Sequence, residues 1–309
     1  MSTYVLFNML SGNGKGKEKA DDLKVFLRGK KALYKDITKI TDWAGFFSEL
    51  NYREDEIIIC GGDGTLNHFI NDTEGLKYSI PLYYYPTGSG NDFWNDIGRK
   101  PGDNPVRIEQ YLKDLPFVEV NGMKKRFLNG IGYGIDGYCC EEGDRQRAAG
   151  NKKINYTNIA INGLLFKYKP TNAEIEVDGQ HFSYKKVWLA PSMNGRYYGG
   201  GMIATPSQDR LSKDRLLSLL LFHGSGKIVT LAIFPSIFKG KHIDHTKNVE
   251  VKTGHRIKVT FDRPVALQID GETVLNVKTT RTARCTISSN TFMTPMLVLS
   301  ILILLLKLV

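Results

Sequence analysis

The sequence has few cysteines for a chain of 309 residues, and their spacing is not that of a metal-binding cluster. The cysteines are Cys60, Cys139, Cys140 and Cys285. The first residues also lack the charged segment and long apolar core of a secretory signal peptide. Both absences are typical of proteins in a reducing compartment, so we expect a cytoplasmic location.

Runs of five or six like charges are absent as well, and the chain contains no recognised nucleic-acid-binding module. The chain is nevertheless basic, because 42 Lys and Arg residues against 32 Asp and Glu residues give a net charge of +10. Such an excess favours anionic partners, which include nucleic acids, nucleotides and acidic membrane surfaces, although it also serves plain solubility. Since no module reads nucleic acid, we expect no nucleic-acid partner.

The sequence contains no apolar run of about 17 to 25 residues, the length that a membrane-spanning helix needs. The apolar C-terminal segment, residues 291–309, comes nearest, because residues 292–306 carry no charge. We expect a buried terminal element there. An interfacial anchor and a short tail anchor are the alternatives, so anchoring of the C-terminus in a membrane stays open.

Residues 56–67, EIIICGGDGTLN, are the most informative segment of the chain. Residues 56–60 form a short apolar run rich in β-branched side chains, typical of a buried strand, and the run ends at a glycine pair. A helix can begin at Gly64. Glycines let the backbone approach a ligand, and a helix N-terminus offers N–H groups, so a phosphate suits this turn. Asp63 can accept a proton or hold a metal-bound water; the alternative is an ordinary glycine turn with a capping aspartate.

Residues 1–122 alternate predicted strands with short predicted helices. We expect strands at residues 4–10, 56–60 and 80–86 and helices at residues 18–27, 42–50, 66–72 and 92–98. This alternation predicts a doubly wound, parallel α/β domain with ligands at the carboxyl ends of its strands. Glycine-rich loops at residues 8–17, 61–67 and 86–93 all follow such ends. We therefore predict that the three loops lie together.

Residues 123–290 have a different sequence pattern, which predicts a mainly antiparallel β domain. Short strands are separated by Gly, Asn or Asp turns, and Asp-Gly pairs at residues 178–179 and 270–271 are typical of hairpins. We expect helices only near residues 154–168 and at residues 227–240.

The first and third loops are ambiguous when taken alone. The first has glycines for a backbone anion nest and lysines for a polyphosphate, but it lacks the Walker A spacing and also suits a flexible surface loop. In the third, Ser89 offers a hydroxyl group, Asn91 can cap a helix, and Asp92 can anchor the loop or a hydrated cation. A capped helix start explains the third loop equally well.

Taken in order, these motifs resemble those of the diacylglycerol kinase catalytic family, which includes bacterial lipid kinases and sphingosine kinases. The family pattern runs NxxSGxG, GGDGTxN, PxGSGND, NxxGxGxDG and a late DGE. It is matched at residues 8–14, 61–67, 86–92, 129–137 and 270–272. The resemblance covers roughly residues 4–275 and implies an NAD kinase-like first domain. GGDGTLN is shared in part with NAD kinases, whereas PTGSGNDF favours the lipid kinases.

The resemblance implies a kinase that uses ATP and Mg2+ to phosphorylate a hydroxyl group of a membrane lipid, probably diacylglycerol or a related lipid. It places ATP at Asn8, Met9, Leu10, Ser11, Gly12, Thr38, Gly61, Gly62, Asp63, Gly64, Thr65, Leu66, Asn67 and Ser89. Glu272 matches the proposed proton acceptor, and Asp63 is the competing candidate. Asp136 falls where the lipid headgroup is expected. A magnesium site is implied at Leu211, Asp214 and Leu216.

Three positions depart from the family pattern. Arg215 and Ser218 stand where the family's DGxLD has its glycine and its second acid, and Met9 replaces a proline. An arginine at position 215 can pair with Asp214 and weaken a cation site. We expect peripheral contact with the inner face of the membrane, and a homodimer is open. The alternatives are an NAD kinase-like enzyme with a soluble substrate and a non-catalytic homologue that binds nucleotide or lipid.

Overall fold

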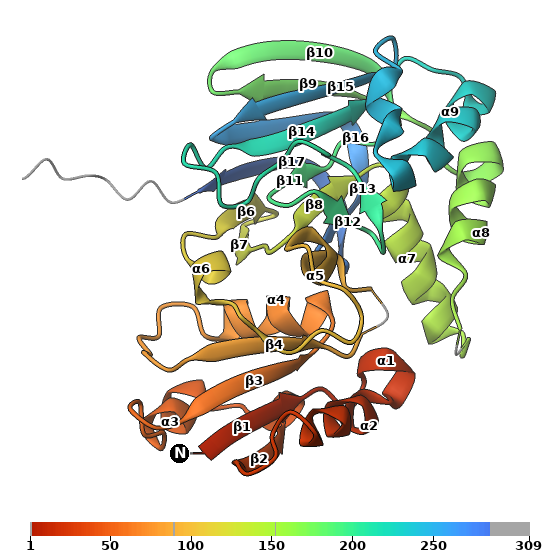
Figure 1. The fold of residues 1–309 in the computed structure, drawn as a ribbon. Helices are drawn as coiled ribbons and strands as arrows, with labels where there is room; N and C mark the ends of the chain where they lie inside the picture. The colour runs from red at the N-terminus through yellow and green to blue at the C-terminus, as the bar shows by residue number, and fades with distance from the viewer. Residues whose placement is uncertain (1, 89, 152, 285–309) are drawn as a thin grey trace, which may run out of the picture.

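The computed structural model describes residues 2–88, 90–151 and 153–284, which form two stacked parts (Figure 1). The first part, red to orange, is built on a five-stranded sheet. The second part contains a ten-stranded sheet with helices along one side. The terminal element expected at residues 291–309 lies outside the described residues.

The first sheet has the order β2-β1-β3-β4-β5. Its strands are β1 (Ser2–Phe7), β2 (Lys31–Asp36), β3 (Glu56–Gly61), β4 (Leu82–Pro86) and β5 (Val106–Arg107). The pairs among β1 to β4 are parallel, and β5 is antiparallel to β4. All six residues of β3 are buried because this strand lies in the middle of the sheet, between two helical layers.

Helices cover both faces of this sheet. They are α1 (Ser11–Gly14), α2 (Gly16–Asp21), η1 (Asp22–Lys24), η2 (Ile37–Lys39), α3 (Trp43–Ser48), α4 (Asp63–Asp72), α5 (Asp92–Asp96) and α6 (Glu109–Leu112). Successive residues of β3 face opposite layers: Ile57 and Ile59 pack with the aromatic residues of α3 and α4, while Ile58 packs against α2 and η1. The predicted doubly wound α/β architecture is confirmed.

Two local predictions for the first part were wrong. β2 was not predicted, because it is an edge strand of partly exposed residues and lacks a continuous apolar run. Residues 11–17, expected as a loop, form α1 and the start of α2. Gly12 and Asn13 have left-handed backbone angles inside α1, so this segment is a tight double turn and not a regular helix.

The second sheet contains only antiparallel pairs among the described strands. Its strands are β6 (Pro116–Val120), β7 (Met123–Arg126), β8 (Gly130–Tyr133), β9 (Thr171–Val177), β10 (Gln180–Val187), β11 (Ser192–Met193), β14 (Leu217–Phe222), β15 (Val249–Gly254), β16 (Arg256–Ile269) and β17 (Glu272–Arg284). A separate ribbon pairs β12 (Tyr197–Tyr198) with β13 (Met202–Ile203). Both predicted Asp-Gly hairpins are present, between β9 and β10 and between β16 and β17. The antiparallel prediction is confirmed.

Helices pack beside this sheet along one edge of the molecule (Figure 1). They are α7 (Ile135–Ala148), α8 (Tyr156–Asn162), the π-helical turn η3 (Gly163–Lys167), α9 (Lys227–Ile233), η4 (Phe234–Lys239) and η5 (Lys241–Asp244). The helices expected at residues 154–168 and 227–240 are therefore present. The helix α7 was missed, because its sequence, IDGYCCEEGDRQRA, has little apolar periodicity.

The division at residue 122 stays a prediction. β6 precedes that position, yet it pairs with β17 in the second sheet. Within the described residues, no helix combines the length and apolar character needed to cross a bilayer.

Candidate active site

Hydrogen bonds join the three glycine-rich loops at the carboxyl edge of the first sheet. Asn8 donates from Nδ2 to Thr65 Oγ1 over 2.9 Å, which links the first loop to the second. Ser11 Oγ and Thr87 Oγ1 share a hydrogen bond of 3.0 Å, which links the first loop to the third. The Thr87 N–H donates to the Gly61 carbonyl over 2.8 Å, which links the third loop to the second. The predicted convergence of the loops is therefore present.

Glycine is required where the second and third loops touch. A Cβ atom on Gly88 would lie 2.5 Å from Gly62 Cα, closer than real Cβ atoms approach. A Cβ on Gly12 would lie 2.6 Å from the Thr87 carbonyl oxygen, and Gly12 also has a φ of +58°. Both contacts bring backbone against backbone, so a side chain at either position would force the loops apart.

The joined loops form a suitable phosphate environment. The helix α4 begins at Asp63 directly after the glycine pair, and the first N–H groups of a helix have no partner within that helix. Lys19 reaches the same place, since its Nζ donates to the Thr87 carbonyl over 3.1 Å. Lys15 and Lys17, the loop lysines expected to supply charge, are exposed instead. Sequence reasoning missed Lys19 because it lies inside α2, beyond the glycine motif.

The remaining predicted nucleotide residues fall into four groups. Met9 and Leu10 are exposed beside the first loop, at 43% and 78% respectively. Thr38 lies at the same edge of the sheet, just after β2, and bonds to Asp36. The side chain of Leu66 is fully buried in the core of the first part, so it cannot itself face a nucleotide. Ser89 lies outside the described residues.

Asp63 has a structural task in this arrangement. Its two carboxylate oxygens accept hydrogen bonds from the backbone N–H groups of Asp92 and Phe93, at 2.8 and 3.0 Å. These bonds cap the start of α5 and fix the third loop to the second. Burial raises the pKa of Asp63 to about 7, and the nearby Asp92 carboxylate adds to the rise. Asp63 therefore caps α5 and not α4, the helix that it begins, and its role as a base stays a prediction.

The Asp270-Gly271-Glu272 hairpin tip is fastened to the second loop. Asn67 donates from Nδ2 to Asp270 Oδ2 over 2.7 Å. The Asp270 carboxylate also accepts the backbone N–H groups of Leu128, Asn129 and Gly130. Asp270 is thus a half-buried structural anchor that holds the hairpin against α4. The next acidic residue along the chain, Glu272, lies at the start of β17.

Glu272 faces His68 across this junction. Its Oε1 lies 3.2 Å from His68 Nε2, and the Glu272 side chain keeps 45% of its surface exposed. The hydrogen bond with His68 lowers the pKa of Glu272, and the same bond raises the pKa of His68. Glu272 is therefore an ionised and accessible carboxylate next to the loops, which is what a proton acceptor requires. His68 was not predicted, because nothing in the sequence links it to a hairpin so distant along the chain.

Asp136, the predicted headgroup residue, begins α7 and packs against the strand pair β8–β16. Burial raises its pKa to about 7. Tyr198 and Gln268 lie beside it, and their side-chain hydrogen bonds to the carboxylate limit the rise. The Gln268 side chain also accepts the Gly271 N–H over 2.7 Å, so Asp136 lies near the hairpin that carries Glu272. A buried carboxyl group with a raised pKa is a candidate for contact with a polar ligand.

Comparison with known proteins agrees with this geometry. Residues 2–116 match the diacylglycerol kinase catalytic domain, and residues 129–287 match the YegS C-terminal NAD kinase beta sandwich-like domain. The chain belongs to the diacylglycerol kinase catalytic family. It is 28% identical over 211 residues to the diacylglycerol kinase of Mycobacterium tuberculosis, a match that covers 65% of this chain and 66% of that relative. The match thus spans slightly less than two thirds of the relative's length.

The fold of this family member also matches solved structures. A crystal structure of a diacylglycerol kinase from Bacillus anthracis str. Sterne aligns with a TM-score of 0.56 and 17% identity, covering 92% of this chain and 93% of that one. At this identity the likeness shows a shared fold alone. The two-part architecture is therefore shared with that structure.

The magnesium position implied by the family pattern has a poor donor set in this member. The Leu216 carbonyl already accepts the Gln208 Nε2–H over 2.9 Å, and Ser218 is buried and bonded to Gln208 Oε1. The Arg215 side chain turns away from Asp214 and donates to the Arg210 carbonyl over 2.9 Å. Among the described residues no three His, Cys, Asp or Glu side chains gather into a metal-binding group.

These contacts leave Asp214 exposed, with Leu211 exposed nearby, while the other acid of this segment, Asp209, accepts the Leu211 N–H over 2.9 Å. The Asp214 backbone carbonyl accepts a hydrogen bond from the His255 ring over 3.1 Å. Arg215 adopts a φ of +53°, a value that favours glycine, which agrees with the glycine of the family pattern at this position. The donor set does not fit a resident ion, and we assign no step of the reaction to one.

Proposed function

We propose that this protein is an ATP-dependent lipid kinase that transfers the γ-phosphoryl group of Mg-ATP to a hydroxyl group of a membrane lipid. Diacylglycerol or a related lipid is the proposed class of acceptor. One observation carries the proposal: hydrogen bonds join the three glycine-rich loops to one another and, through Asn67 and Asp270, to the hairpin of Glu272. Family membership supports the same conclusion.

In this proposal the loops hold the triphosphate, and their existing bonds keep them positioned before the nucleotide arrives. The start of α4 and Lys19 face the phosphates, and Mg2+ enters with ATP as part of the substrate. Glu272 takes the proton of the lipid hydroxyl group while the oxygen of that hydroxyl attacks the γ-phosphorus. The bond between the γ-phosphorus and the β–γ bridging oxygen breaks, and ADP leaves with its electron pair. Asp136 bonds to the polar headgroup of the lipid.

The proposal also fixes the expected partners and location. The acceptor is a membrane lipid, so the protein makes peripheral contact with the inner face of the cytoplasmic membrane. No nucleic-acid partner is proposed. The homodimer and the anchoring of residues 291–309 in a membrane stay predictions.

Transfer of radiolabelled phosphate from ATP to a panel of lipids in mixed detergent micelles tests this function. Label in diacylglycerol or a related lipid supports it. Label transferred only to soluble acceptors such as NAD would favour the NAD kinase-like alternative. ATP binding with no lipid-dependent release of ADP would favour a non-catalytic homologue and overturn the proposal.

A further inference from the structure

The helical edge of the second part exposes large apolar side chains. Phe166 of η3 is 72% exposed, and Ile228 of α9 is 81% exposed. Ile161 of α8 and Val229 of α9 are 42% and 47% exposed. The Lys227 Nζ donates to the Leu165 carbonyl over 2.7 Å, so the residues next to this bond, Phe166 and Ile228, occupy adjoining parts of the surface. We call these four side chains the apolar edge.

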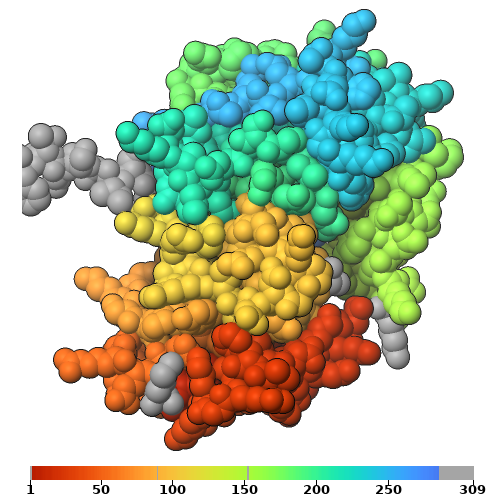
Figure 2. All heavy atoms as spheres, in the orientation of Figure 1, coloured from red at the N-terminus to blue at the C-terminus, as the bar shows by residue number. Residues whose placement is uncertain are grey.

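The apolar edge lies in a strongly basic setting. Residues 153–169 and 225–241, which contain α8, η3 and α9, include no Asp or Glu. They include six lysines: Lys153, Lys167, Lys169, Lys227, Lys239 and Lys241. All six are exposed. In Figure 2 the two segments lie next to each other along one side of the molecule. Apolar side chains surrounded by cations match an anionic bilayer, which offers acyl chains beneath negative headgroups.

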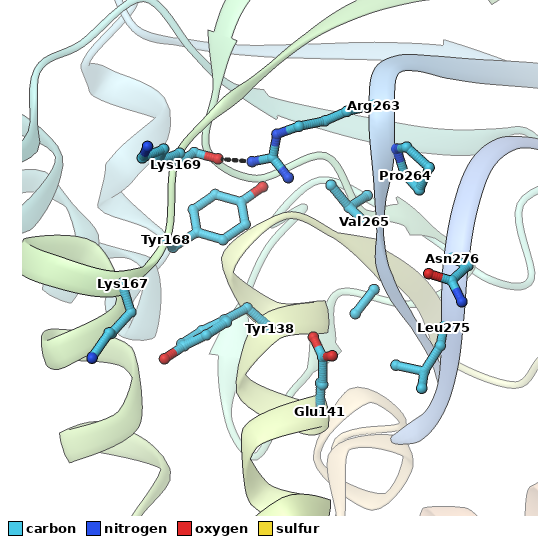
Figure 3. Close-up of a pocket in the computed structure, with 11 residues that line it drawn as sticks. Tyr138, Glu141, Lys167, Tyr168, Lys169, Arg263, Pro264, Val265, Leu275 and Asn276 are labelled. Carbon is cyan, nitrogen blue, oxygen red and sulfur yellow. Dashed lines mark hydrogen bonds between the residues drawn. The ribbon is translucent and has the colours of Figure 1, made fainter.

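A pocket opens beside this edge, between α7, the end of η3 and the β16–β17 hairpin (Figure 3). Its volume is about 480 Å³, and Lys167, Lys169 and Arg263 line it against a single acid, Glu141. Tyr138 and Tyr168 supply aromatic walls, and Arg263 donates to the Lys169 carbonyl, which fixes the guanidinium group at the rim (Figure 3). The volume falls within the range of small-molecule sites, and the excess of cations suits a phosphate group.

We infer that the apolar edge docks this protein on an anionic phospholipid bilayer, with the adjoining pocket receiving a phospholipid headgroup phosphate. Phe166 and Ile228 enter the interface, while the surrounding lysines contact headgroups. The inference rests on the proposed lipid kinase function, because it names the face through which that enzyme meets its substrate's membrane. The pocket lies on the α7 side that faces β16 and β17, so docking brings Tyr138 and Glu141 of α7 next to the bilayer.

Vesicle co-sedimentation without nucleotide tests this inference, using phosphatidylcholine vesicles with and without phosphatidylglycerol. The protein should bind only the anionic vesicles, and added salt should weaken binding. Phe166→Ser with Ile228→Ser should lower the affinity about tenfold or more. Lys167→Glu with Lys169→Glu should lower it by about fivefold or more for each lysine. The matched control is Val25→Ser with Tyr52→Ser, which removes side chains exposed by 69% and 41% in the first part.

Each outcome decides between the inference and the function on which it rests. The inference would be overturned if the apolar-edge variant bound anionic vesicles as tightly as the wild type. It would also be overturned if the control variant lost as much affinity as the apolar-edge variant. So would equal binding to neutral and anionic vesicles. Kinase turnover in detergent micelles is measured in parallel and should not change in the apolar-edge variant. A protein that docks through this edge but transfers no phosphate would refute the kinase function alone.

Discussion

At the scale of single residues, the carboxylates of this site divide into two structural anchors and one proposed reactive group. Asp63 and Asp270 are half-buried, and they accept two and three backbone N–H groups respectively, so their negative charge holds loops in place. Glu272 keeps 45% of its side-chain surface exposed and pairs with the side chain of His68. The bonds to backbone N–H groups therefore distinguish the two structural acids from Glu272, the proposed base.

His68 should control the pH at which Glu272 loses its charge. His68→Ala removes the bond that lowers the pKa of Glu272, so the acid limb of kcat/KM should move to higher pH by less than about one unit. His68→Gln, which keeps a hydrogen-bond donor without the charge, should move it less. The pH profile of lipid phosphorylation measures both. An acid limb that stays in place in His68→Ala would contradict this role.

The His68–Glu272 pair also stabilises the folded protein, and it does so over a limited range of pH. The His68 contribution is fully present below its ordinary pKa, near 6.5, and disappears as the pH rises through its raised pKa. The Glu272 contribution is present above its ordinary pKa, near 4.5, and disappears as the pH falls through its lowered pKa. The pair therefore stabilises the protein most between these limits, and weakly, because both side chains are exposed.

At the scale of elements, the contact between the second and third loops depends on the absence of side chains. Gly88→Ala would place a Cβ 2.5 Å from Gly62 Cα. We expect a loss of about 1–3 kcal/mol in stability and at least a tenfold loss in ATP affinity. Gly64→Ala is the control for stability, since a Cβ there has no neighbour within 4 Å. Calorimetric titration with ATP and thermal unfolding measure the two effects; normal ATP affinity in Gly88→Ala would count against the shared site.

The segment around Asp214 is held by its own side chains. Gln208 bonds to Asn194, Leu216 and Ser218, and Arg215 closes the turn on Arg210. Removing divalent ions with EDTA, in the absence of nucleotide, should therefore leave the thermal midpoint unchanged. A resident ion at a hundredfold excess over its Kd would instead add about 2.7 kcal/mol. A rise in the midpoint on adding Mg2+ would restore the magnesium assignment at Asp214.

The sequence predicted the elements whose signals are local and missed those whose signals depend on tertiary contacts. Each of the three loops follows an apolar strand, so their position at a shared edge of the sheet could be inferred from the rules of parallel sheets. The edge strand β2 and the helix α7 lack strong periodicity and escaped prediction. The Asn67–Asp270 bond joins residues 203 positions apart, and no single sequence reveals such a pairing. For the same reason His68 and Lys19 emerged only from the structure.

At the scale of the whole molecule, a buried ionic network connects the two parts. Asp96 of α5 accepts hydrogen bonds from Arg196 and Arg210, and Arg210 also donates to the Leu128 carbonyl and to Asn129 Oδ1. Asp92 accepts the N–H groups of Gly200 and Gly201. These bonds hold the second part against the nucleotide loops, so they contribute to the position of Glu272 relative to those loops.

Arg210→Ala should therefore be costly. It leaves the buried Asp96 carboxylate paired only through Oδ1 with the partly exposed Arg196, and we expect a loss of about 3 kcal/mol in the free energy of unfolding. Lys24→Ala, which removes an exposed ion pair with Asp21, is the control and should cost less than about 1 kcal/mol. Denaturant unfolding measures both variants. Equal losses in the free energy of unfolding of the two variants would contradict a stabilising role for the Asp96–Arg210 contact.

The central claim is that three bonded loops hold a triphosphate facing Glu272. Its most direct test is the Glu272→Gln variant, with ATP affinity and phosphate transfer to lipid measured on the same preparation. The account predicts ATP binding close to that of the wild type and transfer reduced by about 10²-fold or more. Transfer near the wild-type rate would contradict it.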